Sequence, residues 1–248
     1  SFCYNEIAFA VANHPALSKL GGDIMNELLW FGFAIVNFAL FLGIFKIFGK
    51  TGIFAWIAIG TILANIQVTK SITVFGLHAT LGNIMYGTIF LATDALNELY
   101  GKKSAAKAVL LGFFILLATL VIMQISLLFI PNEEDVAHDA LATIFGFLPR
   151  LAAASLTAFL ISQFLDVNLF QKIRKLLPED RFLWIRNNGS TFVSQLVDTL
   201  IFVPIAFLGI YSFPVVLQIA VSTYLIKVLV ALLDTPFLYL IKRIRPLE

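Results

Sequence analysis

The 248-residue sequence contains few charged residues, three histidines and one cysteine. Asp, Glu, Lys and Arg together make up 13% of the chain, which is low for a soluble domain. The single Cys3 excludes an internal disulfide and a metal cage built from cysteines. His14, His78 and His138 fall in expected loops or at a helix end and form no HExxH motif. We therefore expect no catalytic residues, no metal site and no cofactor.

Apolar residues dominate the chain instead. Hydrophobic residues account for 60% of it, and the mean hydropathy is +0.93, which indicates an integral membrane protein. A helix that crosses roughly 30 Å of hydrocarbon needs about 20 residues. We expect an all-α polytopic membrane bundle of seven transmembrane helices, with a six-helix transporter core at 52–241 and an extra N-terminal helix at 28–48. The predicted spans are 28–48, 53–69, 74–101, 106–130, 141–165, 190–211 and 215–241.

Polar stretches and helix breakers separate these spans. Residues 1–27, which Pro15 and Gly21 interrupt, are expected to form an extracytoplasmic or interfacial segment without a signal peptide. Residues 166–188 are the longest expected polar connection, and Pro149 is expected to interrupt the fifth span. Residues 242–248 form a basic tail, and no internal sequence repeat is evident.

The basic residues are distributed unevenly between the two sides of the predicted bundle. With the N-terminus outside, only Lys19 and Lys70 lie in outer loops, whereas most of the 17 Lys and Arg residues lie in inner loops or the tail. Cytoplasmic loops of membrane proteins carry this excess of positive charge. We therefore expect a multi-pass protein of the cell inner membrane, with the N-terminus outside and the C-terminus cytoplasmic. The inner set is Lys46, Lys50, Lys102, Lys103, Lys107, Lys172, Arg174, Lys175, Arg181, Arg186, Lys242, Arg243 and Arg245.

Five charged residues fall inside the predicted spans: Asp94, Arg150, Asp198, Lys227 and Asp234. Each costs about 2.5–3.5 kcal/mol on insertion scales, so each needs a partner or a function. Asp198 and Lys227 have similar expected depths on neighbouring antiparallel helices, which predicts an ion pair. Asp94 is expected to pair with Arg150, with Lys227 or with the basic inner loops. An ion pair that only fixes helix packing remains the alternative to a role in substrate or proton handling.

Uncharged polar residues share helix faces with these charges. Asn83, Tyr86, Asp94 and Glu98 follow helical spacing along 74–101. A polar face is costly against lipid, so it indicates a cavity or contacts with other helices. The predicted substrate-binding residues are Asn65, Asn83, Tyr86, Asp94, Arg150, Gln195, Asp198, Tyr224 and Lys227, and the predicted structural or coupling residues are Gln163, Asp166, Glu98 and Asp234.

This combination of side chains favours one kind of ligand. Carboxylates, amides and aromatic rings without a cluster of cations suit a flat, polar, near-neutral heterocycle. A carboxylate accepts hydrogen bonds from the ring N–H and exocyclic amine of a guanine-like edge, and aromatic rings stack on its face. Amino acids and other vitamins remain open as alternatives.

Several motifs resemble the queuosine-precursor transporter family, also called the vitamin uptake transporter family. They cover most of the chain from Leu63 onward and comprise ILANIQVTKSI, ATLGNIMYGTIFLATDALNELYGKKSA, FLPRLAAASLTAFLISQFLDVNLFQKIR, WIRNNGSTFVSQLVDTLIFVPIAFLG and TYLIKVLVALLDTPFLYL. The resemblance implies a six-helix core that imports 7-deazaguanine compounds for tRNA modification: 7-cyano-7-deazaguanine, 7-aminomethyl-7-deazaguanine or queuine. It places the family's polar motif positions at Asn65, Asp94, Arg150, Gln163, Asp166, Asp198, Tyr224 and Lys227. The extra first span and the long N-terminal segment depart from some members.

The leading hypothesis is therefore a transporter of a small 7-deazaguanine substrate, working by alternating access in a lipid bilayer. It is driven either by a proton carried on Asp94 or Asp198, or by consumption of the substrate inside the cell. One alternative is the substrate-binding subunit of an energy-coupling-factor importer, which needs ATPase partners. Others are an intramembrane enzyme and a structural assembly protein. No nucleic-acid partner is expected, and a homo-oligomer is open.

Overall fold

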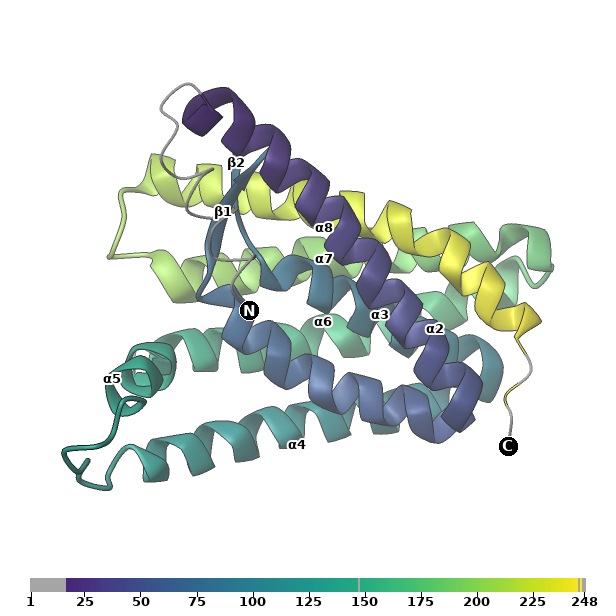
Figure 1. The fold of residues 1–248 in the computed structure, drawn as a ribbon. Helices are drawn as coiled ribbons and strands as arrows, with labels where there is room; N and C mark the ends of the chain where they lie inside the picture. The colour runs from purple at the N-terminus through teal and green to yellow at the C-terminus, as the bar shows by residue number, and fades with distance from the viewer. Residues whose placement is uncertain (1–16, 147, 245, 247–248) are drawn as a thin grey trace.

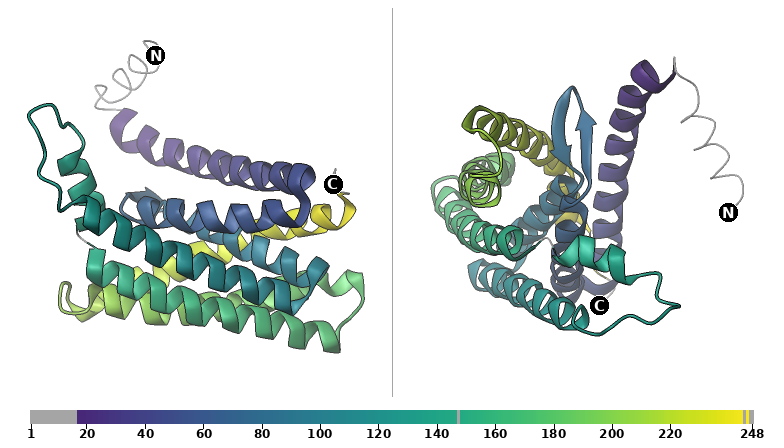
Figure 2. Two further views of the ribbon diagram at one scale, coloured as in Figure 1. Left: turned by 90° about the horizontal axis from the view of Figure 1, so that it is seen from below. Right: turned by 90° about the vertical axis from the view of Figure 1, so that its left-hand side faces the viewer.

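A computed structural model describes residues 17–146, 148–244 and 246 (Figure 1). Cys3, His14 and most of the predicted interfacial segment 1–27 lie outside these ranges, as does part of the predicted tail. The long helices lie side by side in one bundle (Figure 2). They are α2 (Leu17–Val68), α3 (Gly82–Tyr100), α4 (Lys102–Ser126), α6 (Leu148–Leu176), α7 (Leu183–Phe207) and α8 (Phe213–Arg243).

Among the residues that the structure describes, five helices are long and apolar enough to cross a membrane: α2, α4, α6, α7 and α8. The expected all-α, multi-pass membrane bundle is therefore confirmed. The predicted span 28–48 and all but the last residue of the predicted span 53–69 lie in α2, which reverses at Gly49 (Figure 1), where φ is 47° and ψ is −131°. Glycine adopts this conformation without the clash that a Cβ creates.

The first part of the predicted third span, 74–101, is wrong, because residues 71–80 are not helical. They form a β-hairpin in which β1 (Ser71–Val74) pairs antiparallel with β2 (Leu77–Thr80), and α3 begins only at Gly82. Phe75 and Gly76 connect the strands with φ values of 54° and 70°, and turns with two positive φ values match the twist of a hairpin. Glu27 of α2 accepts a hydrogen bond from the Phe75 N–H at 3.2 Å. The hairpin stands beside α2 and α8 (Figure 2, right).

The connection predicted at 166–188 is also wrong. Helix α6 continues to Leu176, only residues 177–182 connect it to α7, and Pro149 lies in its first turn. Polar residues in this stretch bind within the bundle. The Gln171 side-chain amide donates a 2.5 Å hydrogen bond to the Asn97 side chain, and Arg174 donates to the Asn97 carbonyl at 3.1 Å.

Before α6, the helix α5 (His138–Leu141) and a π-helical turn (Ala142–Gly146) follow the loop after α4. The Gln124 side chain of α4 donates a 2.6 Å hydrogen bond to the Phe145 carbonyl in that turn. A 3-10 turn (Asp180–Phe182) precedes α7. A polar side chain of α4 thus holds the irregular connection before α6.

Helix α3 occupies the interior of the bundle. Almost all of its residues are buried, whereas α4 buries a single stripe that includes Ala105, Ala108 and Gly112. At Gly87, an added Cβ would collide with Val230 of α8, so the two helices approach closely there. The first arm of α2 contributes Trp30, Phe38 and Phe45 to the same hydrophobic core. The extra N-terminal helix is therefore packed against the predicted six-helix core.

Candidate functional site

A cavity of about 600 Å³ lies between α3, α6, α7 and α8. It reaches the end of the bundle that carries β1, β2 and the α7–α8 turn, which we call the hairpin end. Thr69, Thr80 and Tyr211 line it there. Phe202, Phe207 and other apolar side chains form much of its wall. Largely apolar cavities of about 300–1,000 Å³ with a few polar groups are typical of small-molecule sites.

Asp198 of α7 and Lys227 of α8 line this cavity and form an ion pair, which confirms their predicted pairing. Lys227 lies halfway along α8. The other Asp198 oxygen, Oδ1, accepts a 3.0 Å hydrogen bond from the Ser162 hydroxyl of α6. The side chain of Asp198 is 15% exposed and that of Lys227 is 7% exposed, so the pair is largely desolvated yet accessible from the cavity.

Two more predicted residues, Asn83 and Tyr86 of α3, line the same cavity. Asn83 is 3% exposed, and its side-chain nitrogen has no hydrogen-bond partner. The Tyr86 hydroxyl interacts with the side chains of Ser155 and Asn65. Asn65 also donates a 2.8 Å hydrogen bond to the Thr61 carbonyl in its own helix. It therefore reaches the site through Tyr86.

The remaining predicted binding residues do not line the cavity. The Gln195 side chain is buried with an unpartnered oxygen, and the Tyr224 hydroxyl lies 3.4 Å from the Phe192 carbonyl. Arg150 is exposed, and its guanidinium binds the Ile205 and Leu208 carbonyls at the end of α7. The last carbonyls of a helix lack intrahelical donors, so Arg150 caps α7.

Asp94 lies deeper, and its predicted pairing with Arg150, Lys227 or the inner loops is wrong. Its carboxylate and that of Asp166 both lie 3.4 Å from the Thr191 hydroxyl, which has one proton to donate. Asp166 also accepts a 2.9 Å hydrogen bond from Ser194. Asp234 accepts a 2.7 Å hydrogen bond from Asn187. These three carboxylates form no ion pair with a basic side chain in the described part of the chain.

Gln163, another predicted structural residue, lies one turn before Asp166 on α6. It is fully buried, and neither its side-chain oxygen nor its nitrogen has a partner. Within the described residues, no group of three or more His, Cys, Asp and Glu side chains is arranged to hold a metal ion. The interior thus contains polar groups whose hydrogen-bonding capacity is only partly used.

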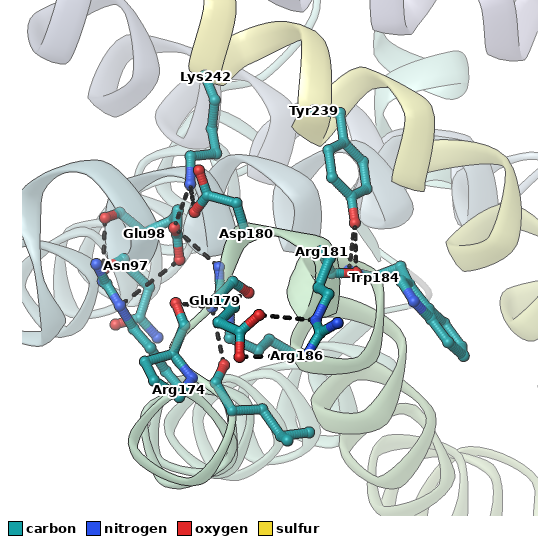
Figure 3. Close-up of polar contacts among 12 residues, drawn as sticks. Asn97, Glu98, Arg174, Glu179, Asp180, Arg181, Trp184, Arg186, Tyr239 and Lys242 are labelled. Carbon is teal, nitrogen blue, oxygen red and sulfur yellow. Dashed lines mark hydrogen bonds and ion pairs between the residues drawn. The ribbon is translucent and has the colours of Figure 1, made fainter.

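At the opposite end of the bundle, which we call the C-terminal end, Glu98 joins three basic side chains (Figure 3). Its Oε1 lies 3.0 Å from Arg186 Nη2 and 2.9 Å from Lys242 Nζ, and its Oε2 lies 3.7 Å from Arg174 Nε. Lys242 also pairs with Asp180. These residues belong to α3, α6, α7, α8 and the turn before α7. The network therefore links α3, α6, α7 and α8 at this end.

Arg186 is the most deeply buried member of the network, with no exposed surface. Its Nη1 donates to the carbonyls of Leu177, Pro178 and Glu179 at 3.0, 2.9 and 3.2 Å. These carbonyls follow the end of α6, so one guanidinium ties the α6–α7 connection to α3. The bundle is therefore held together at the C-terminal end and hollow at the hairpin end.

Sequence reasoning missed several polar residues of the cavity. Gln218 and Ser222 lie one turn apart on α8, and Thr223 lies one turn before Lys227. Only Thr223, four residues before Lys227, has the helical spacing that predicts a shared face. Ser155 of α6 and Thr143 of the π-helical turn also line the cavity. Nothing in the sequence aligns them with α8, because that depends on how the helices pack.

A family model and three curated proteins are similar in sequence to this chain. A family model described as a vitamin uptake transporter matches residues 80–241, which run from α3 to near the end of α8 and include Ser162, Asp198 and Lys227. The chain belongs to this family. This member of the vitamin uptake transporter family matches no solved structure.

Three curated relatives share its sequence. The "Probable queuosine precursor transporter" of Bacillus subtilis (strain 168) is 54% identical over 223 residues, which cover 90% of this chain and 97% of that protein. The "Queuosine precursor transporter" of Escherichia coli (strain K12) is 29% identical, covering 68% of this chain and 75% of that protein. A "Probable queuosine precursor transporter" of Haemophilus influenzae is 28% identical over 54% of each chain. This chain is thus similar to proteins named as transporters.

Proposed function

We propose that this chain imports queuosine precursors of the 7-deazaguanine class through the cavity between α3, α6, α7 and α8. The observation that carries the proposal is the Asp198–Lys227 ion pair on the wall of a cavity of about 600 Å³. The names of the three relatives support this substrate class. Asn83 supplies an amide to the cavity, while Phe202 and Tyr211 supply aromatic surface.

In the proposed topology the N-terminus lies outside the cell inner membrane and the C-terminus lies inside. Both arms of α2 cross the bilayer, as does α3, which gives seven crossings. The distribution of Lys and Arg supports this orientation, since the basic residues Lys102, Arg174 and Lys242 lie at the C-terminal end. The cavity then faces outward, and the Glu98 network closes the inner side. Alternating access requires such a state.

Uptake of labelled 7-cyano-7-deazaguanine into cells that cannot synthesise it tests the proposal. We expect Asp198→Asn and Lys227→Met each to lower uptake by at least ~10-fold, because hydrogen bonds to charged groups contribute about 1.5–3 kcal/mol. The matched control is Glu179→Gln, since Glu179 forms an exposed ion pair with Arg181. Normal uptake by both folded variants contradicts the site.

Proteoliposomes that contain only the purified chain test its autonomy. Uptake of the labelled base into these vesicles is expected without any ATPase subunit. Uptake that appears only after an ATPase module is added contradicts an autonomous importer. That outcome favours the energy-coupling-factor arrangement.

A further inference from the structure

The Asp198–Lys227 pair places a hydrogen-bond acceptor directly beside a donor on the cavity wall. Asp198 Oδ2 binds Lys227, and Oδ1 binds the Ser162 hydroxyl. A carboxylate has about four lone-pair sites, and an ammonium group has three protons. These contacts therefore leave unused acceptor sites on Asp198 and unused protons on Lys227, and both side chains line the cavity.

We infer that this pair reads the amide edge of a guanine-like base, an assignment that rests on the proposed function. The edge carries an exocyclic amine and a ring N–H as adjacent donors, followed by a carbonyl oxygen as acceptor. Asp198 accepts from the two donors, and Lys227 donates to the carbonyl oxygen. An adenine-like edge places a ring nitrogen acceptor opposite the carboxylate. Two acceptors facing each other at a largely desolvated site are unfavourable.

The size of the cavity determines how strongly the site distinguishes substituents at the 7-position of the base. With the amide edge on Asp198 and Lys227, the five-membered ring extends toward the hairpin end. Phe207, Tyr211 and Gln218 line that part of the cavity. A volume of about 600 Å³ exceeds what a bicyclic base requires, so space remains around the ring substituent. The site thus discriminates strongly at the amide edge and weakly at the 7-substituent.

Binding titrations on the purified chain in detergent test this assignment with four bases. We expect 7-deazaguanine, 7-cyano-7-deazaguanine and queuine to bind within about 10-fold of one another. We expect 7-deazaadenine to bind at least ~100-fold more weakly, because its six-membered ring lacks the carbonyl, the ring N–H and the neighbouring exocyclic amine, so buried polar groups lose their partners. This comparison requires no variant and so does not depend on the folding of a mutant.

The variant Asp198→Asn provides a second test, because an amide places a donor NH2 group beside an acceptor oxygen and can match an adenine-like edge. We expect the affinity ratio of 7-deazaguanine to 7-deazaadenine to fall by at least ~10-fold in this variant. The matched control, Ser222→Ala, also alters the cavity wall. It should change all affinities by a similar factor and leave the ratio intact.

Each outcome decides the assignment. Binding of 7-deazaadenine within ~10-fold of 7-deazaguanine, or an unchanged ratio in folded Asp198→Asn, overturns it. If 7-cyano-7-deazaguanine is still transported, the proposed function survives that result. If none of the four bases binds, the proposed function fails, and the assignment fails with it.

Discussion

Two ion-paired regions of this bundle contain the same chemistry in different surroundings. At the C-terminal end, Glu98 and Arg186 use their charges on each other and on neighbouring groups of the chain. Near the middle, Asp198 and Lys227 pair in a similar way but border an open cavity. Unused donors and acceptors that face free space can bind a ligand. The comparison teaches that accessible space, rather than charge, distinguishes a candidate site from a structural tie.

The largest expected effect comes from breaking the structural tie. Glu98→Ala leaves Arg186 buried without its carboxylate, and removing one partner of a buried ion pair costs about 3–5 kcal/mol. We expect a strong loss of folded protein, measured as the melting temperature in detergent. A variant that melts like the wild type and retains base binding would show that Glu98 does not stabilise the bundle.

Reversing the cavity pair sharpens the comparison. The double variant Asp198→Lys with Lys227→Asp retains an ion pair but exchanges the positions of donor and acceptor. We expect a melting temperature close to that of the wild type and uptake lowered by at least ~10-fold, because the substrate edge no longer matches. Wild-type uptake by the reversed pair would mean that the pair serves packing alone.

Helix α3 connects the two ends, and its close contact with α8 predicts an intermediate effect. Gly87→Ala introduces a Cβ that collides with Val230, and overpacking costs about 1–3 kcal/mol. Gly43→Ala is the control, since an added Cβ there meets nothing within 4 Å. A melting temperature that falls equally in both variants would indicate a general effect of alanine.

The smallest expected effect concerns an exposed ion pair at the C-terminal end. Glu179 and Arg181 lie 2.7 Å apart but are 60% and 69% exposed, and such pairs contribute about 0–1 kcal/mol. We expect Glu179→Gln to leave the melting temperature and uptake nearly unchanged. A drop comparable to that of Glu98→Ala would show that exposure does not separate the two classes of ion pair.

The sequence was sufficient to predict the membrane bundle and the Asp198–Lys227 pair. Counting residues from helix ends gives depth, and a short turn makes consecutive helices neighbours. The sequence was not sufficient to predict the neighbours of Asp94, because Asp166 and Thr191 come from helices that are distant in sequence. Depth does not tell which face of a helix meets which neighbour.

Element boundaries failed for a related reason. The polar residues Gln171 and Arg174 suggested a loop, but they extend α6 by binding Asn97 inside the protein. The apolar run that begins at Val74 suggested a span, although the β-branched Val74 and the following Gly76 suit a hairpin. Apolar composition alone does not separate a short buried strand from the start of a helix.

The buried position of α3 has a consequence for biosynthesis. Helix α3 is not among the five helices of the described residues that are long and apolar enough to cross a membrane, and it carries Asp94 and Glu98. A carboxylate near the middle of a helix opposes its transfer from the translocation channel into lipid. In the proposed topology, helix α3 therefore enters the bilayer alongside α2 and α4, against which it packs. Truncations that remove α2 or α4 should prevent α3 from entering the bilayer during synthesis.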